Sequence, residues 1–331
     1  MPTRKPATRL SIRYQSEDFG PSWGILASGD LGVTWDDLVH AAITVGRPNR
    51  QYVFQYGASS LYELLFRLSL VRMALEQRTE HSCRFCRTEA FAALDPTEKG
   101  AISYFLGIVL CKLFAEELLD TPWLLHLDVF RDQLKAELSQ RSRPDLIGQR
   151  QDTGAWIGFE CKGRSNPPDA AVKDRAKEQA TRLISVGGTP CSLHIGTIAY
   201  FRGDELEFCW LDPPADSAGD IEVPFTDDVW RAYYQPIREV LVSSDPDWLA
   251  NISDPAGTRD GRDGRGVRIE AADFSLGLHP KIAPLLARGE WAEAKRTADS
   301  LANVLKEEGY YLDGLRVVVG ESWFKPFSVP L

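Results

Sequence analysis

Three charged side chains lie in one short segment at a spacing that could hold a metal ion. Asp145 stands at the head of a short apolar run, and Glu160 and Lys162 stand at the end of a second one. The polar, glycine-containing turn between the two runs, 148–154, predicts a β-hairpin. Side chains alternate between the two faces of a strand, so Glu160 and Lys162 project the same way. In-register pairing of the hairpin would bring Asp145 beside them.

Two carboxylates and one ammonium at a strand end have a chemical use. Hard divalent cations such as Mg²⁺ take oxygen ligands, usually one or two carboxylates together with substrate phosphate and water. Asp145, Glu160 and the backbone carbonyl of Cys161 are the candidate metal ligands. The Lys162 ammonium would orient the attacking water or neutralise charge on a phosphorane-like transition state. The competing interpretation is a surface hairpin on which Glu160 and Lys162 form an exposed pair.

Pro144-Asp145 followed by Glu160-Cys161-Lys162 resembles the motif of the PD-(D/E)xK nuclease superfamily. The resemblance implies a restriction-endonuclease-like α/β core, in which helices flank a mixed central sheet in the order helix, strand, strand, strand, helix, strand. It also implies phosphodiester hydrolysis that leaves a 5′-phosphate, with Mg²⁺ or Mn²⁺ as cofactor. Asp145, Glu160 and Lys162 would then be catalytic residues.

The sequence around the motif offers those elements in the same order. Asp95, Pro96 and Glu98 form a strong helix start, and a nearly all-apolar helix should run from there to Leu119. The other predicted elements are a strand over 123–130, the two motif strands, a helix over 170–186, and strands over 192–201 and 206–211. We therefore predict a core at 96–214, between an N-terminal mixed α/β region at 1–95 and a C-terminal α+β region at 215–331.

Two further residues become site candidates through the resemblance. In many members the first core helix carries an additional acid near the metal, and Glu117, on the apolar stripe of the predicted helix, is the candidate. Glu116 is interpreted instead as half of a solvated i,i+4 pair with Lys112. Several branches carry a glutamine on the second helix that contacts the lysine or a substrate phosphate, which makes Gln179 a candidate catalytic residue. A solvated helix position is the alternative for Gln179.

The charge of the chain is unevenly distributed. A formal net charge of −9 argues against a protein that coats nucleic acid without specificity. Between Arg141 and Arg182, however, nine basic residues stand against six acidic ones. Such a local basic surface favours a phosphate backbone. Arg164, Arg175 and Arg182 are the candidate nucleic-acid-binding residues, with a solvated helix face as the alternative.

Composition is that of an ordinary globular protein, with 44% hydrophobic and 26% charged residues in 331. No apolar run reaches the roughly eighteen residues that cross a bilayer, and no apolar segment follows the basic N-terminus. The six scattered cysteines suit reduced core positions. We therefore expect a cytoplasmic protein without a membrane partner.

Two segments outside the predicted core carry weaker signals. His81, Cys83 and Cys86 have the spacing of half a zinc site, but no further ligand pair at the usual spacing completes it, so metal binding there is left open. In the C-terminal region we predict a flexible loop at 254–266 and a helical segment at 280–308.

The resemblance and the local charge together predict a metal-dependent nuclease that acts on DNA, with RNA left open. An acidic nuclease with an unmatched C-terminal third suits a multi-component system, so we expect an effector in bacterial anti-phage defence. A homodimer and a partner protein of such a system are the protein partners considered. The alternative is a catalytically silent nucleic-acid-binding or scaffold subunit on the same fold.

Overall fold

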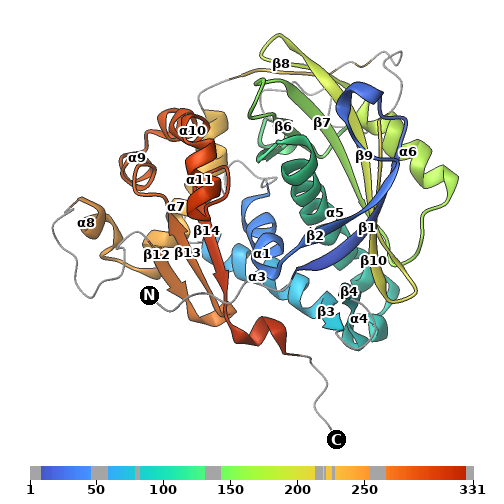
Figure 1. Cartoon of the computed structure of the whole chain (residues 1–331), viewed down its shortest axis with the longest axis horizontal. Coiled ribbons are helices and arrows are strands. Elements are labelled where there is room, and N and C mark those ends of the chain that lie inside the picture. The colour runs from blue at the N-terminus through green and yellow to red at the C-terminus, as the bar shows by residue number, and fades with distance from the viewer. Residues whose placement is uncertain are drawn as a thin grey trace, which may run out of the picture.

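The computed structural model describes residues 9–45, 59–78, 83–130, 143–212, 219, 221–225, 228–253 and 266–325. In these residues a large mixed sheet is flanked by helices, and a smaller three-stranded sheet with the C-terminal helices lies beside it (Figure 1). In the described part of the chain, no helix combines the length and the apolarity needed to cross a membrane.

The longest path through the large sheet has the strand order β2-β1-β4-β10-β9-β7-β6-β5. In chain order these strands are β1 Leu10–Glu17, β2 Ser28–Val33, β4 Arg84–Arg87, β5 Trp123–His126, β6 Leu146–Gln149, β7 Trp156–Gly163, β9 Thr189–Arg202 and β10 Glu205–Leu211. The shorter strands of this sheet are β3 Leu75–Arg78, β8 Leu183–Val186 and β11 Ile221–Val223. β5, β6 and β7 form an antiparallel meander, whereas β7 pairs in parallel with β9.

Two helices cover opposite faces of the sheet at β7, namely α5 Pro96–Leu119 and α6 Ala170–Ala180. Gly163 allows α5 to approach β7 closely, and Gly158 lies on the opposite face of the strand, toward α6. A Cβ at Gly163 would lie 1.6 Å from the carbonyl oxygen of Ser103 on α5, whereas a Cβ at Gly158 would lie 3.6 Å from that of Ala180 on α6. Because side chains alternate along a strand, the even-numbered residues of β7 share the α6 face.

Helix α5 begins and ends where the sequence predicts. Oδ1 of Asp95 accepts hydrogen bonds from the backbone N–H groups of Thr97 (2.7 Å) and Glu98 (3.2 Å), which satisfies two donors of the first turn. At the other end Asp120 adopts a left-handed conformation with φ 47°, and its N–H closes the last turn. Most side chains between these caps are buried, so α5 is a core helix.

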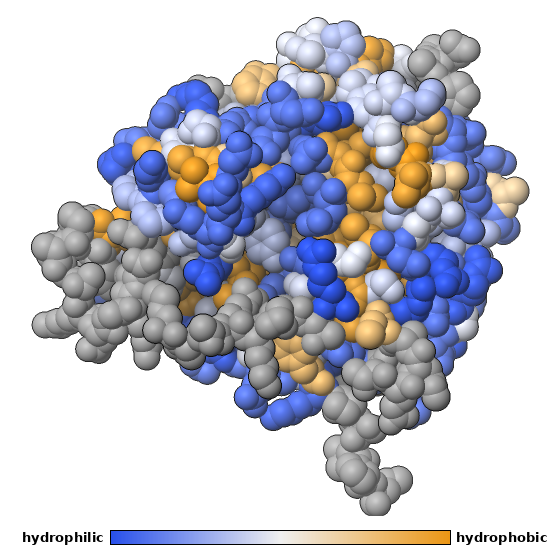
Figure 2. All heavy atoms as spheres, in the orientation of Figure 1, coloured by the Kyte–Doolittle hydropathy of each residue, from blue (hydrophilic) through white to orange (hydrophobic). Residues whose placement is uncertain are grey.

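The C-terminal part of the chain forms a second group of elements. Its antiparallel sheet consists of β12 Gly266–Ile269, β13 Phe274–Leu278 and β14 Leu315–Val319. Its helices are α7 Asp228–Ser244, α8 Trp248–Ser253, α9 Ala283–Arg288, α10 Trp291–Ser300 and α11 Ala302–Glu308. The N-terminal helices are α1 Trp35–Thr44, α3 Ser59–Ala74 and α4 Glu89–Ala93, and the 3-10 turns are Pro21–Trp23, Leu127–Phe130, Glu270–Ala272 and Glu321–Phe324. Hydrophilic side chains dominate the surface over α9 to α11, while hydrophobic ones gather toward the strands of the large sheet (Figure 2).

A buried polar cluster joins the C-terminal elements to α1. The carboxylate of Asp313 lies 2.9 Å from Nε2 of His40 and accepts a hydrogen bond of 2.7 Å from the Tyr233 hydroxyl. His40 also stacks on Tyr311, with ring centroids 3.6 Å apart. The four residues come from three segments, α1, α7 and the turn at 311–313, so the cluster fastens the C-terminal part to the N-terminal helices.

Several sequence-based predictions need correction or extension. The helix predicted over 170–186 ends at Ala180, and 183–186 forms β8, because this run pairs with β9 and β11. The strand predicted over 123–130 ends at His126 and continues as a 3-10 turn. The boundary predicted near residue 95 falls within one sheet, because β1 pairs with β10. His81 and 254–265 lie outside the described residues; Cys83 is exposed and Cys86 is buried in β4.

Candidate active site

The antiparallel register of β6 and β7 brings the motif carboxylates together. Leu146 pairs with Phe159, so Asp145, one position before β6, stands opposite Glu160. Oδ2 of Asp145 accepts a hydrogen bond of 2.9 Å from the N–H of Cys161, and its backbone carbonyl accepts one of 2.8 Å from the N–H of Leu127. Asp145 is therefore fixed between the ends of β5 and β7.

Glu160 is an incompletely paired buried carboxylate. Its residue is only 2% exposed, and its Oε1 accepts a hydrogen bond from the Lys162 ammonium on the same face of β7. Its other oxygen, Oε2, is buried and has no partner in good hydrogen-bonding geometry among the described residues, although the backbone N–H of Asp145 lies near enough to lower the pKa of Glu160. A buried carboxylate oxygen without a hydrogen-bond partner costs free energy of folding. This indicates that a ligand or a water molecule binds at Oε2.

The electrostatics of the pair favour a bound positive charge. Burial, and then the negative charge of Asp145, raise the pKa of Glu160 to about 8. Burial also raises the pKa of Asp145, against the opposing effects of the Cys161 N–H and of Lys162. The charge of Asp145 thus makes ionisation of Glu160 harder. A cation between them would reverse this penalty, and Lys162 offsets only part of it.

The backbone of Cys161 supplies a third oxygen on the same side. In a strand, the N–H and C=O of one residue point toward the same neighbour, and the N–H of Cys161 points at Asp145. Its carbonyl therefore also lies toward Asp145, as the sequence predicts for a metal ligand. Among the described residues, no group of three or more His, Cys, Asp or Glu side chains could hold a metal ion. The donor set here is two carboxylates and one carbonyl.

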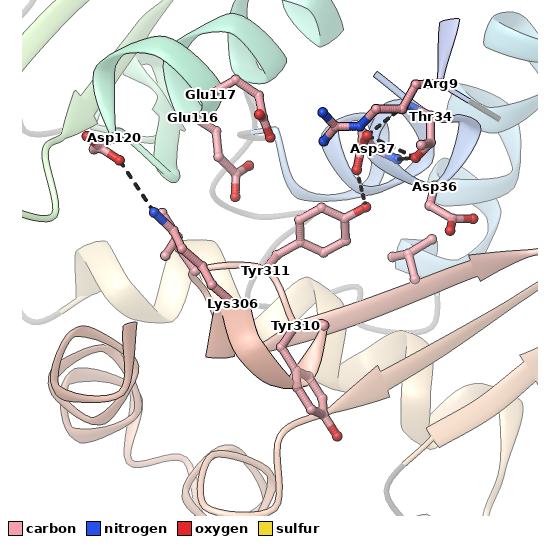
Figure 3. A pocket seen from close by; sticks show the side chains of 13 residues that line it. Arg9, Thr34, Asp36, Asp37, Glu116, Glu117, Asp120, Lys306, Tyr310 and Tyr311 are labelled. Carbon is pink, nitrogen blue, oxygen red and sulfur yellow. Dashed lines mark hydrogen bonds and ion pairs between the residues drawn. The ribbon is translucent and has the colours of Figure 1, made fainter. Parts of the chain in front are cut away.

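Glu117 does not belong to this site, contrary to the sequence-based prediction. Helix α5 reaches the site near Gly107, where a Cβ would lie 2.7 Å from the carbonyl oxygen of Lys162. Glu117 lies ten residues further along, or about 15 Å at 1.5 Å per residue. It lines a cavity of about 610 Å³ at the other end of α5, toward which Glu116 and Tyr311 also point (Figure 3). Burial, followed by the charges of Asp37 and Glu116, raises the pKa of Glu117 to about 7.

The structure places Gln179 away from Lys162. Along α6, Ala176 packs against Gly196, which is paired with Glu160, and Ala180 packs near Gly158. Gln179 therefore lies nearer the level of Gly158 than that of Lys162, and its half-buried side chain is on the last turn of α6.

The three candidate arginines divide between the two ends of β7. Arg164 follows Gly163 directly, is exposed, and its N–H donates to the carbonyl of Ala199, which places it beside the site. Arg175 is exposed on α6. Arg182 follows α6, and its carbonyl accepts a hydrogen bond from the N–H of Ile221, so it lies toward the opposite end of β7 and does not flank the carboxylates.

Two residues of α5 border the site without having been predicted. Ser103 packs against Gly163, and its buried hydroxyl has no hydrogen-bond partner among the described residues. Tyr104 follows it, and burial and then the charge of Asp145 raise the pKa of its hydroxyl. In the sequence these two residues interrupt an otherwise apolar stretch of the helix. That interruption was the available signal.

His126 and Asp128 lie at the same end of the sheet. His126 pairs with Leu146, and its buried Nδ1 accepts the N–H of Asp128 at 3.2 Å. Burial lowers the pKa of His126 to about 4, so its ring is neutral at pH 7. Asp128 forms an ion pair with Arg143. These residues pack beside Asp145, and their polar contacts are mainly with one another.

Comparison of the chain with protein-family models, with curated proteins and with solved structures found no match in any of the three.

Proposed function

We propose that this protein is a metal-dependent nuclease of PD-(D/E)xK type that hydrolyses phosphodiester bonds of DNA. The observation that carries the proposal is the buried, unpartnered Oε2 of Glu160, next to Asp145 and Lys162 at the end of β7. An exposed surface pair, the competing interpretation of the motif, would not bury Glu160 to 2% exposure. The order α5, β5, β6, β7, α6, β9 also supports a restriction-endonuclease-like core.

The residues fit a Mg²⁺ or Mn²⁺ ion. Asp145, Glu160 and the Cys161 carbonyl would hold it, because hard cations take oxygen ligands and commonly use two carboxylates. When bound, such an ion would neutralise negative charge on the phosphate and lower the pKa of water. The pKa values of both carboxyl groups are raised, so their ionised forms are disfavoured, and a bound cation would stabilise those ionised forms.

The protein's own groups have separable tasks in this proposal. The hydrogen bond from Cys161 N–H fixes Asp145, and β7 fixes the spacing between Glu160 and Lys162. Lys162 is 30% exposed and its ammonium reaches Glu160, so it can meet a phosphate oxygen that approaches from solvent. A cation placed to meet developing negative charge lowers the barrier without reorganising at the moment of reaction.

The chemical outcome would be attack of water on phosphorus, with a 5′-phosphate and a 3′-hydroxyl as products. RNA as a substrate and a role in anti-phage defence stay within the proposal, the latter on the acidic chain and its C-terminal third. A silent nucleic-acid-binding or scaffold subunit is the outcome to be separated by experiment.

The test is cleavage of linear and circular, single- and double-stranded DNA and RNA by purified protein, with Mg²⁺ or Mn²⁺ and with chelator. We expect metal-dependent cleavage of DNA that disappears in Glu160→Gln. A second measurement is the melting temperature with and without Mn²⁺, which a metal site raises by linkage. Stabilisation by Mn²⁺ without any cleavage would favour the silent binding subunit. The absence of both stabilisation and cleavage would overturn the metal site itself.

A further inference from the structure

An exposed strip of aromatic side chains leads away from the carboxylate pair. Tyr62 and Phe66 on α3 are 72% and 51% exposed, and Tyr104 on α5 is 39% exposed. Phe105 is half-buried between them. We call these four residues the aromatic strip. Exposed aromatic residues that adjoin one another commonly mark an interaction site, whereas singly scattered ones do not.

Ring contacts make the strip continuous across two helices. Phe66 and Phe105 meet edge to face, with centroids 5.4 Å apart and an interplanar angle of 88°. Tyr104 and Phe105 are also 5.4 Å apart, at 73°. Tyr62 and Phe66 are four residues apart on α3 and so lie on one face of that helix. The strip therefore runs from α3 to Tyr104 without a break.

The strip ends at Tyr104, on the side of the sheet where Asp145 lies within electrostatic reach. The charge of Asp145 raises the pKa of Tyr104, which places the phenol within electrostatic reach of the carboxylate. Ser103, the preceding residue, packs on the backbone of Gly163 next to Lys162. The strip lies on the α5 face of β7, whereas Glu160 and Lys162 project from the α6 face, so a bound strand would pass over the end of β7 at Gly163 to reach them.

The chemistry of the strip and its surroundings favours nucleobases. Bases stack on aromatic rings whatever their sequence, because every base has a π-face. Phosphate contacts are less available on α6, where Lys173 and Lys177 form ion pairs with Glu17 and Asp18. In a chain of net charge −9, stacking would supply affinity that the electrostatics do not. In a duplex the base faces are occupied by neighbouring bases, so only unpaired bases can use the strip.

We propose that the aromatic strip binds the unpaired bases of a single-stranded stretch of DNA and delivers its backbone to Asp145, Glu160 and Lys162. This inference rests on the proposed nuclease function and names its substrate as single-stranded. The occupant is the nucleic acid, not a second copy of this chain or another protein.

The test measures binding of a fluorescently labelled single-stranded DNA oligonucleotide by anisotropy, with chelator present so that no cleavage occurs. Removing one stacking ring typically costs 1–3 kcal/mol per base, so Phe66→Ala and Tyr62→Ala should each weaken binding about 5- to 150-fold. Phe66→Leu keeps an apolar side chain without a ring and should bind about as weakly as Phe66→Ala. The matched control is Phe225→Ala, since Phe225 is 43% exposed and lies by Trp156, at the other end of β7.

Three further arms decide the occupant. Duplex DNA of the same sequence should bind more weakly and be insensitive to Phe66→Ala, while RNA of that sequence reports whether the sugar matters. Wild-type affinity in Phe66→Ala, Tyr62→Ala and the double variant would overturn the inference. So would light scattering that finds a dimer in the wild type and a monomer in Phe66→Ala, because the strip would then be an interface between copies.

Failure here is distinguishable from failure of the proposed function. If the strip variants bind normally but the wild type still cleaves with metal, only the single-strand inference falls. If the strip binds single strands but no substrate is cleaved with Mg²⁺ or Mn²⁺, the nuclease proposal falls and the binding surface stands.

Discussion

Buried carboxylates gather at both ends of α5, and the two groups differ in how completely they are paired. Near the C-terminal end, Asp37 accepts hydrogen bonds from Thr34 and Tyr311, and Asp313 is bonded to His40 and Tyr233. Near the N-terminal half, Oε2 of Glu160 has no partner in the described residues. Asp313 and Glu160 are both buried, so burial alone does not separate the two groups.

The difference lies in what each group contributes to folding. A fully hydrogen-bonded buried carboxylate fastens segments together, and the loss of one partner leaves the other buried groups without their interaction. Although burial opposes its ionisation, His40 and the hydrogen bonds to Asp313 hold the pKa of this carboxyl at about 2. Glu160 shows the reverse, a pKa raised to about 8. The two pKa shifts are therefore opposite for the structural acid Asp313 and for the proposed metal ligand Glu160.

The largest effect is expected from Glu160→Gln, which removes the charge of the unpaired acid at nearly constant volume. Cleavage should fall at least about 10³-fold, because the variant loses a charged ligand of the proposed metal ion on which the reaction depends. The control is Glu117→Gln, which removes an acid near the C-terminal end of α5, outside the site, and should cleave at the wild-type rate. Single-turnover cleavage measures both, and equal losses would erase the distinction between the two ends of α5.

Asp313→Asn should instead affect stability. It breaks a buried pair with His40 and leaves the Tyr233 hydroxyl poorly matched, at a cost of about 3–5 kcal/mol in the free energy of unfolding. Urea denaturation gives this number. The matched control, Lys306→Gln, removes an exposed partner 3.8 Å from Asp120 and should change it by less than about 0.5 kcal/mol. A loss below about 1 kcal/mol in Asp313→Asn would mean that the cluster does not fasten the fold.

Lys162→Met separates metal binding from chemistry. It keeps the apolar stem and deletes the charge, so calorimetric Mn²⁺ affinity should persist while single-turnover cleavage drops about 10²–10³-fold. Glu160→Gln should lose both. Wild-type cleavage by Lys162→Met would return the motif to an incidental strand-end pair.

Glu117 predicts a pH dependence of stability with a definite sign. Because its folded-state pKa is raised to about 7, the ionised form is disfavoured in the folded protein, and stability should fall as pH rises from about 4.5 to 7. Its side chain opens to the cavity, so solvent screening limits the effect to about 1 kcal/mol. Melting temperatures at pH 5 and pH 8 should differ less in Glu117→Gln than in the wild type. An unchanged difference would assign the dependence to other groups.

The smallest effect distinguishes the arginines at the two ends of β7. Arg164→Ala should lower the slope of log affinity against log salt by about 1, because it removes one phosphate contact beside the site. Arg182→Ala lies toward the other end and should leave the slope unchanged. Binding to one oligonucleotide across a salt series suffices, and equal slopes for the two variants would return Arg164 to a solvated role.

The features that could be predicted from the sequence are those that depend on residues close together in the chain. Helix α5 was predicted to the residue because its caps, Asp95 and the break after Leu119, are local signals. Glu160 and Lys162 were placed on one face because strand alternation is local as well. The prediction for Glu117 was wrong because helical periodicity gives the face on which a residue lies but not its distance from the site along the helix axis. The predicted end of α6 was wrong because the short run Leu183 to Val186 fits both a helical and a strand pattern. Only its pairing with β9 and β11 makes it a strand.

The parallel pairing of β1 with β10 delays completion of the large sheet during synthesis of the chain. Arg13 aligns with Glu207, so the first strand of the sheet waits about 190 residues for this neighbour. At roughly 5–20 residues per second, that interval is about 10 to 40 s on the ribosome. During it β1 can pair with β2, its antiparallel neighbour along the chain, and with β4 at Ser11 once Arg84 has been made. Completion of the sheet is thus deferred until two thirds of the polypeptide has been made, after Asp145, Glu160 and Lys162 have all been translated.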